Sequence, residues 1–196
     1  MRLHGGIAFI LGLFLMLGIG WFVFPLALYE TIDQPLQFSH KKHTGEQAGM
    51  SCEDCHGFRE NGTFCGIPPL ENCINCHSEP QGTSAAEKVL FEKYITKKRD
   101  IPWLVYSRQP ENVYFSHIQH VKLAGIKCER CHGPHGTSET LPPYQRNRIS
   151  GYSRNIWGQS ISGIRSAPWD GMKMDDCERC HAERSAGAAS CLDCHK

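Results

Sequence analysis

The pentapeptide Cys-x-x-Cys-His occurs five times in this chain of 196 residues and uses ten of its eleven cysteines. Two thiols three residues apart lie on one side of a short turn, where they can add to the two vinyl groups of one haem. This spacing followed by His is the attachment signal for c-type haem. The motifs predict thioether attachment through Cys52, Cys55, Cys73, Cys76, Cys128, Cys131, Cys177, Cys180, Cys191 and Cys194. Imidazole is a standard ligand of haem iron, which predicts ligation by His56, His77, His132, His181 and His195.

Two other kinds of protein are rich in cysteine. A short secreted chain can be a disulfide scaffold, and pairs of Cys-x-x-Cys also build zinc sites. Neither explains a His directly after the second cysteine of every pair, and the βαβ pattern that accompanies a redox Cys-x-x-Cys is absent. Aliphatic residues are sparse after residue 30, so five porphyrins would supply the buried apolar surface that a domain of this size needs.

Five histidines outside the motifs are candidates for the second axial position of each iron: His40, His43, His117, His120 and His135. Four of them occur in two copies of Phe-Ser-His-x-x-His, at residues 38–43 and 115–120, each ahead of a haem motif. We expect the two histidines of a copy to reach two different haems, although ordinary surface histidines are the alternative. His4 stands on the far side of the N-terminal apolar segment and is not expected to be a ligand.

Two imidazoles leave an iron with no open position, so we expect most of the haems to be low-spin and to carry electrons rather than bind substrate. Cys65 is the odd cysteine. It is either a free buried thiol or the single thioether link of a sixth haem. Met172 and Met174 precede the fourth motif; methionine can bind haem iron, but we expect a packing role for both.

The first 30 residues are predicted to be a transmembrane anchor. Residues 5–29 contain no charged side chain, and about 20 apolar residues suffice to cross a bilayer. Arg2 precedes this run, whereas Glu30 and Asp33 follow it, so the positive-inside rule places the remaining chain in the periplasm. A cleaved signal peptide is the alternative, but its apolar region is normally shorter and ends in small residues.

Residues 31–196 are expected to form one pentahaem domain that is mostly irregular, with short helices and no regular sheet. Ser84 and Glu87 form a capping-box pattern that opens a connector helix over about residues 85–98. Residues 136–170 contain no haem motif but several Arg, Tyr and Trp side chains; they form either a partner surface or a cover for haem edges. The net charge of +1 does not favour nucleic-acid binding.

The two copies of Phe-Ser-His-x-x-His with their haem motifs resemble class III multihaem cytochromes, the cytochrome c3 and c7 group. Longer strings, at residues 64–77, 101–103 and 113–117, resemble the cytochrome subunits of alternative complex III and of the Qrc menaquinone reductase. The first of these has a ligand His where Ser107 stands here, and residues 136–170 are unlike it. The resemblance therefore favours the Qrc type.

That resemblance implies an electron-transfer subunit rather than an enzyme in itself. Electrons would arrive from periplasmic cytochrome c3 and pass to iron–sulfur and molybdopterin-type subunits, and an integral membrane subunit would reduce menaquinone. The alternative is the reverse flow of a quinol-oxidising alternative complex III, toward periplasmic acceptors. A stand-alone nitrite or sulfite reductase would need an open iron, which five available second ligands do not favour.

Overall fold

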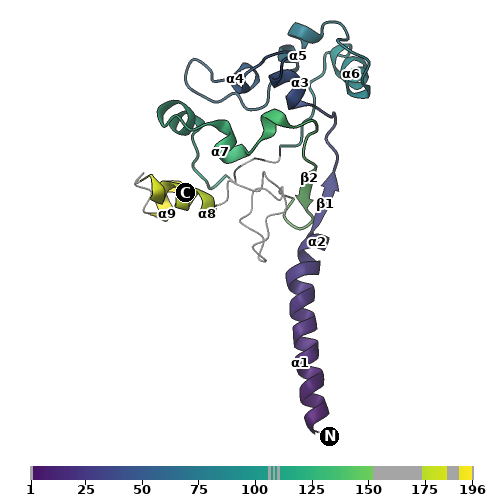
Figure 1. Ribbon diagram of the computed structural model, residues 1–196, viewed down its shortest axis with the longest axis vertical. Helices are drawn as coiled ribbons and strands as arrows, with labels where there is room; N and C mark the ends of the chain where they lie inside the picture. The colour runs from purple at the N-terminus through teal and green to yellow at the C-terminus, as the bar shows by residue number, and fades with distance from the viewer. Residues whose placement is uncertain are drawn as a thin grey trace.

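The computed structural model describes residues 2–105, 107, 109, 111–151, 174–184 and 190–195. A long N-terminal helix stands apart from a domain of short helices joined by irregular chain (Figure 1). The helices and single turns of this domain, in chain order, are α3 (His40–Thr44), α4 (Cys52–Cys55), α5 (Leu70–His77), α6 (Ala85–Leu90), η2 (Phe91–Ile95), η3 (Ile118–Leu123), α7 (Cys128–His132), η4 (His135–Thr137), α8 (Met174–Glu183) and α9 (Cys191–Cys194).

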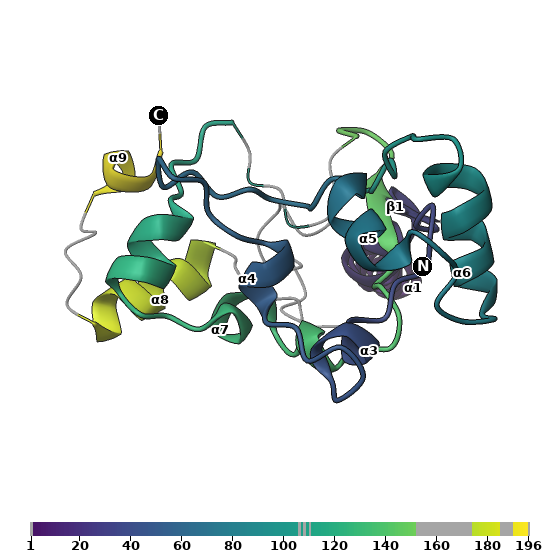
Figure 2. The same ribbon diagram turned by 90° about the horizontal axis from the view of Figure 1, so that it is seen from above.

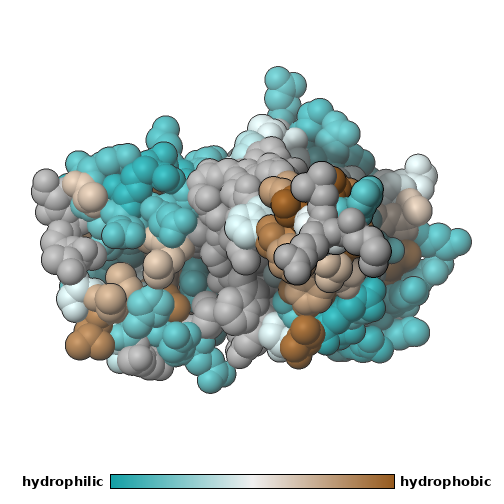
Figure 3. Space-filling view, turned by 90° about the horizontal axis from the view of Figure 1, so that it is seen from below, coloured by the Kyte–Doolittle hydropathy of each residue, from teal (hydrophilic) through white to brown (hydrophobic). Residues whose placement is uncertain are grey.

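The N-terminal helix is built from α1 (Arg2–Gly18), the π-helical turn η1 (Ile19–Val23) and α2 (Phe24–Leu28). By length and composition, the stretch His4–Val23 is able to cross a membrane, and none of it is buried against the rest of the chain. Viewed from below, apolar side chains gather around this helix, while hydrophilic residues cover much of the rest (Figure 3). The helix ends at Leu28.

A two-stranded antiparallel sheet directly follows this helix. Strand β1 (Tyr29–Ile32) pairs with β2 (Tyr144–Asn147), with Tyr29 opposite Asn147 and Ile32 opposite Tyr144. The expectation of no regular sheet was therefore wrong. Each strand is only four residues long and finds its partner more than a hundred residues away, so neither one stands out as a strand in the sequence.

The β1–β2 ribbon also accounts for part of the predicted partner surface. Arg146 and Arg148 both form ion pairs with Glu30, and the Arg146 Nε donates to the Glu30 carboxylate at 2.6 Å. These two arginines therefore fasten residues 136–151 to the exit of the N-terminal helix. Arg154, Arg165, Tyr152, Trp157 and Trp169 lie outside the described residues.

The buried apolar cluster of the described residues is small and lies at one end of the domain, around α5, α6 and η2. Its members are Leu36, Leu70, Leu90, Tyr94 and Ile101. The predicted connector helix is present: α6 begins at Ala85 and continues through η2 to Ile95, and the Ser84 hydroxyl accepts a hydrogen bond from the Glu87 backbone at 3.1 Å. Away from this end, the described part of the domain has no such cluster, which fits a fold organised around prosthetic groups.

Candidate haem sites

All five motifs lie on short helices, α4, α5, α7, α8 and α9. Residues three apart share one face of a helix, so both thiols of each pair are presented on the same side. The sequence Ser-Cys-x-Asp-Cys-His explains two of these helices. Ser51 with Asp54, and Ser190 with Asp193, form capping boxes that start α4 and α9 at the first cysteine.

The thiols are arranged neither as disulfides nor as zinc sites. All eleven cysteines, each of which the structure describes, are free. Among the described residues, no three His, Cys, Asp or Glu side chains converge in a way that could hold a metal ion. The paired cysteines are therefore available as free thiols, as covalent attachment to two vinyl groups requires.

The first copy of Phe-Ser-His-x-x-His has a compact geometry. The Phe38 ring stacks on His43 with ring centres 4.3 Å apart and meets His40 edge-on at 4.9 Å. The His43 Nδ1 lies 2.8 Å from the Ser39 carbonyl oxygen. With Nδ1 donating to that oxygen, Nε2 is left as the nitrogen that can bind a metal.

The second copy repeats this geometry. Phe115 stacks on His120 at 4.6 Å and meets His117 edge-on at 4.8 Å, and the His120 Nδ1 lies 2.8 Å from the Ser116 carbonyl oxygen. The internal repeat seen in the sequence is thus a repeat of structure as well.

A glycine turn follows each copy and leads to the next haem motif. Gly49 and Gly125 both have φ of +62°, a conformation that favours glycine. The Met50 N–H then donates to the His43 carbonyl at 2.9 Å, and the Ile126 N–H to the His120 carbonyl at 3.0 Å.

Three of the second-ligand candidates face a motif histidine. A bond between an imidazole nitrogen and a first-row metal is about 2 Å and the ring centre lies roughly 1.1 Å behind the nitrogen, so two rings on opposite sides of one metal have centres roughly 6.3 Å apart. The observed pairs are His43–His77 at 6.1 Å, His117–His132 at 6.3 Å and His120–His181 at 6.0 Å. The described residues therefore fit haem iron held between two imidazoles.

Both histidines of the second copy face motif histidines, whereas only His43 does so in the first copy. In the second copy, His117 faces the third motif and His120 the fourth. In the first copy, His43 faces the second motif. His40 departs from this pattern, because its nearest imidazole is that of His135, with ring centres 6.2 Å apart.

The surroundings of His40 are closed and rich in imidazole. Burial, with smaller contributions from the neighbouring His135, His56 and His43, lowers the pKa of His40 to about 4. Its Nδ1 lies 3.3 Å from the Ser138 hydroxyl, and the Lys41 N–H donates to the Ser138 carbonyl at 3.0 Å. Both His40 and His135 thus lie in the neighbourhood of the first motif. The structure describes every histidine of the chain, and neither His56 nor His195 is paired with a second imidazole at the ring-centre spacing of about 6 Å seen for the other three motif histidines.

The thiols give the spatial order of the motifs, which differs from their order in the chain. Besides burial, which raises the pKa of each thiol, neighbouring cysteines contribute: Cys76 to Cys55, Cys52 to Cys128, Cys180 to Cys131, and Cys194 to Cys177. The second motif is thus beside the first, the first beside the third, the third beside the fourth, and the fourth beside the fifth. Figure 2 shows the corresponding row α5, α4, α7, α8, α9.

The remaining candidates are placed as follows. Cys65 is exposed, so the expectation of a buried thiol was wrong; it follows the turn at Gly62 that returns the chain toward the first motif. Met174, the first residue of α8, is 63% exposed, and Met172 lies outside the described residues. His4 is exposed on α1, apart from the motif helices (Figure 1).

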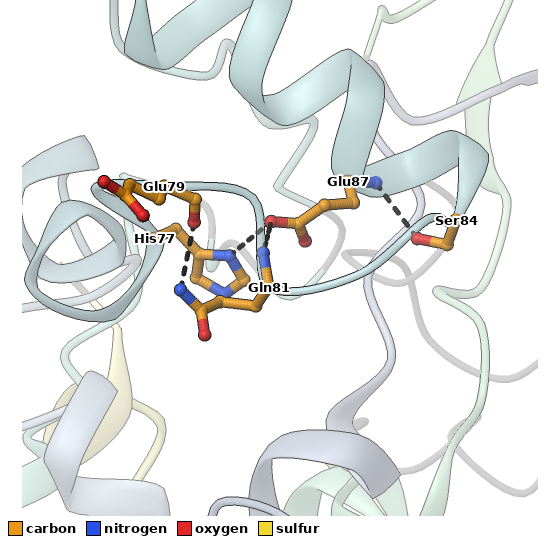
Figure 4. A network of polar contacts seen from close by, with 5 residues as sticks. All are labelled: His77, Glu79, Gln81, Ser84 and Glu87. Atoms are coloured by element: carbon orange, nitrogen blue, oxygen red, sulfur yellow. Dashed lines mark hydrogen bonds and ion pairs between the residues drawn. The ribbon is translucent and has the colours of Figure 1, made fainter.

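Glu87 contacts a candidate iron ligand, although the sequence pattern indicated only a helix-capping role for it. A capping box would send its carboxylate back to the Ser84 backbone. Instead, Oε1 accepts hydrogen bonds from the His77 Nδ1 at 2.8 Å and from the Gln81 backbone N–H at 3.0 Å (Figure 4). The short separation between a motif histidine and an acidic residue that opens the next helix is the only sequence signal that could have revealed it.

Comparison with known proteins agrees with this geometry. Residues 113–196 match the family of cytochrome c7 and related cytochrome c. The chain is 36% identical over 207 residues to the multihaem cytochrome c subunit of menaquinone reductase from Nitratidesulfovibrio vulgaris (strain Hildenborough), an overlap that spans 98% of this chain and 90% of that protein. The resemblance to this group and the expected fold of short helices with one N-terminal apolar helix are confirmed. The chain is therefore a multihaem cytochrome c that belongs to the family of menaquinone reductase cytochrome subunits.

Proposed function

We propose that this chain binds five haems c through its ten paired cysteines and serves as the electron-entry wire of a menaquinone reductase, without a catalytic site of its own. The observation that carries this is the row of five thiol pairs, three of them with an imidazole pair at the spacing of a shared iron. When bound, a haem c with two imidazole ligands supplies a one-electron carrier with no open position for substrate.

The axial ligands follow from the ring pairs. His77, His132 and His181 bind from the motif side, and His43, His117 and His120 respectively bind from the other. The half-buried His40 and His135 rings are the two candidates for the second ligand near His56. Partial burial lowers the pKa of His40 and that of His135, which favours the neutral imidazole that binds iron. Burial, with neighbouring histidines, likewise lowers the pKa of His132 to about 4.

The row gives the relay its two ends. One end is the second motif on α5, where Leu70 packs with Leu36, a residue of the segment that follows the membrane helix and β1. The other end is the fifth motif on α9, which is tied to residues 113–114 by a hydrogen bond from the Tyr114 N–H to the Cys194 carbonyl at 2.8 Å. Electrons would cross the domain between these ends.

The membrane location and the partner proteins are proposed from the family and from the N-terminal apolar helix. The N-terminal helix is an uncleaved anchor in the cytoplasmic membrane, and the haem domain faces the periplasm. Periplasmic cytochrome c3 supplies the electrons, and the receiving partners are iron–sulfur, molybdopterin-type and integral membrane subunits that reduce menaquinone. A mature N-terminus near residue 30 would contradict the anchor.

The test is to purify the complex from membranes, identify the subunits that accompany this chain, and follow the haem absorption after rapid mixing. Reduced cytochrome c3 is expected to reduce the haems, whereas menaquinol is not. Reduction by menaquinol together with no response to cytochrome c3 would reverse the assigned direction. A chain that carries no haem would refute the proposal as a whole.

A further inference from the structure

The His77 imidazole has an anionic partner inside the domain. Its Nδ1 lies 2.8 Å from Oε1 of Glu87, and the two side chains are only 17% and 12% exposed. The same carboxylate oxygen accepts from the Gln81 N–H at 3.0 Å, and the Gln81 side chain is held by the Glu79 carbonyl at 3.0 Å (Figure 4). Ser84 fixes the backbone of Glu87 through its hydroxyl. The carboxylate is thus held in place from several sides.

The other imidazoles with assigned Nδ1 contacts have uncharged partners. Among the described residues, His43, His120 and His56 lie against carbonyl oxygens, at 2.8, 2.8 and 2.7 Å. His40 lies near a hydroxyl. In this set, a carboxylate contact is found only at His77.

We propose that Glu87 is a positioning residue that lowers the reduction potential of the haem at Cys73 and Cys76, and makes it the most negative of the three haems with paired imidazoles. This inference rests on the proposed function, because it requires His77 to bind iron. The haem motifs are alike in sequence and do not themselves distinguish the haems. Glu87 would give one of them a different reduction potential.

The physical reason is charge. A carboxylate that accepts the Nδ1 proton of a metal-binding histidine fixes the ring and makes the ligand more basic. A more basic ligand and a nearby negative charge both favour ferric over ferrous iron, and hydrogen bonding of this kind is one of the ways a protein sets haem potential. The site is little exposed, so water screens the charge weakly.

The test is Glu87→Gln in the complete complex, with the haem potentials measured by a spectroscopically monitored redox titration. Glutamine keeps an oxygen that can accept from His77 but removes the charge. The expected result is a shift of one haem to a more positive potential, with the remaining haems unchanged. Glu92→Gln is the matched control, because Glu92 lies on the following turn with a 61% exposed side chain, and it should leave every potential in place.

A second variant keeps the test decisive. Glu87→Asp retains the charge but moves it away from His77 by the length of one methylene group. The shift in reduction potential should therefore be smaller than that of Glu87→Gln and in the same direction. If both variants keep all their haems and show the potentials of the Glu92→Gln control, the role of Glu87 is refuted. Loss of the haem at Cys73 and Cys76 in both would also overturn it, since Glu87 would then act in assembly rather than on the potential. A wild-type chain without haem at these cysteines would instead overturn the proposed function.

Discussion

Replacing His43 with alanine tests the axial assignment at a single iron. The ring centres of His43 and His77 are 6.1 Å apart, so removal of His43 leaves the iron held by His77 with one protein ligand. The other two imidazole pairs use different residues and should be untouched. The expected result is that one iron per chain, about a fifth of the total if all five sites are filled, changes from low-spin to high-spin.

The same substitution has a cost in stability that can be worked from the structure. It removes the stack of Phe38 on the ring, at 4.3 Å, which is worth about 1 kcal/mol. It also removes the hydrogen bond to the Ser39 carbonyl, worth about 1 kcal/mol. The domain should therefore lose about 2 kcal/mol in addition to the iron bond, measured by denaturant unfolding of the haem-loaded protein.

The assay for the iron is electron paramagnetic resonance of the oxidised complex, with the high-spin signal integrated against total haem. His4→Ala is the matched control, because His4 is an exposed imidazole of α1, and it should leave the spectrum unchanged. An unchanged spectrum for His43→Ala, or conversion of two irons, would refute the assignment of His43 to the second motif.

Four further substitutions, in two matched pairs, test the packing of the domain. Leu90→Ala opens a cavity in the small apolar cluster and should lower the free energy of unfolding by about 2–5 kcal/mol, whereas Leu123→Ala, at a side chain 72% exposed, should change it by less than about 0.5 kcal/mol. Gly62→Ala places a Cβ 2.6 Å from the Ile118 Cδ1 at a φ of +81°, and should cost about 1–2 kcal/mol. Gly82→Ala, which meets nothing within 4 Å, is its control. Denaturant unfolding of the haem-loaded protein measures all four, and equal midpoints within either pair would contradict the packing described here.

The candidate haem sites could be named from the sequence because the chemistry that they require is local. Both cysteines and one candidate ligand of each haem lie within five residues. The repeated Phe-Ser-His-x-x-His segments indicate candidates for the second iron ligands by their spacing alone. The structure brings His43, His117 and His120 to motif histidines. Such short-range patterns survive without knowledge of the fold, because they depend on helical geometry and not on long-range packing.

The features that the sequence did not reveal all depend on contacts between distant segments. The order of the motifs in space differs from their order in the chain. The first motif lies between the second and the third. The meeting of His40 with His135 joins residues 95 apart, and β1 pairs with β2 across a similar gap. Glu87 was hidden for another reason, since a capping-box pattern already accounted for its identity.

The central claim, haem at every Cys-x-x-Cys-His, is tested most directly by intact-mass spectrometry of the chain isolated from membranes, after its free thiols have been alkylated. The expected mass is that of the polypeptide plus five haems, with one alkyl group on the exposed Cys65. Six haems with no alkyl group would place an additional haem at Cys65. Fewer than five haems, or alkylation at any of the paired cysteines, would contradict the claim.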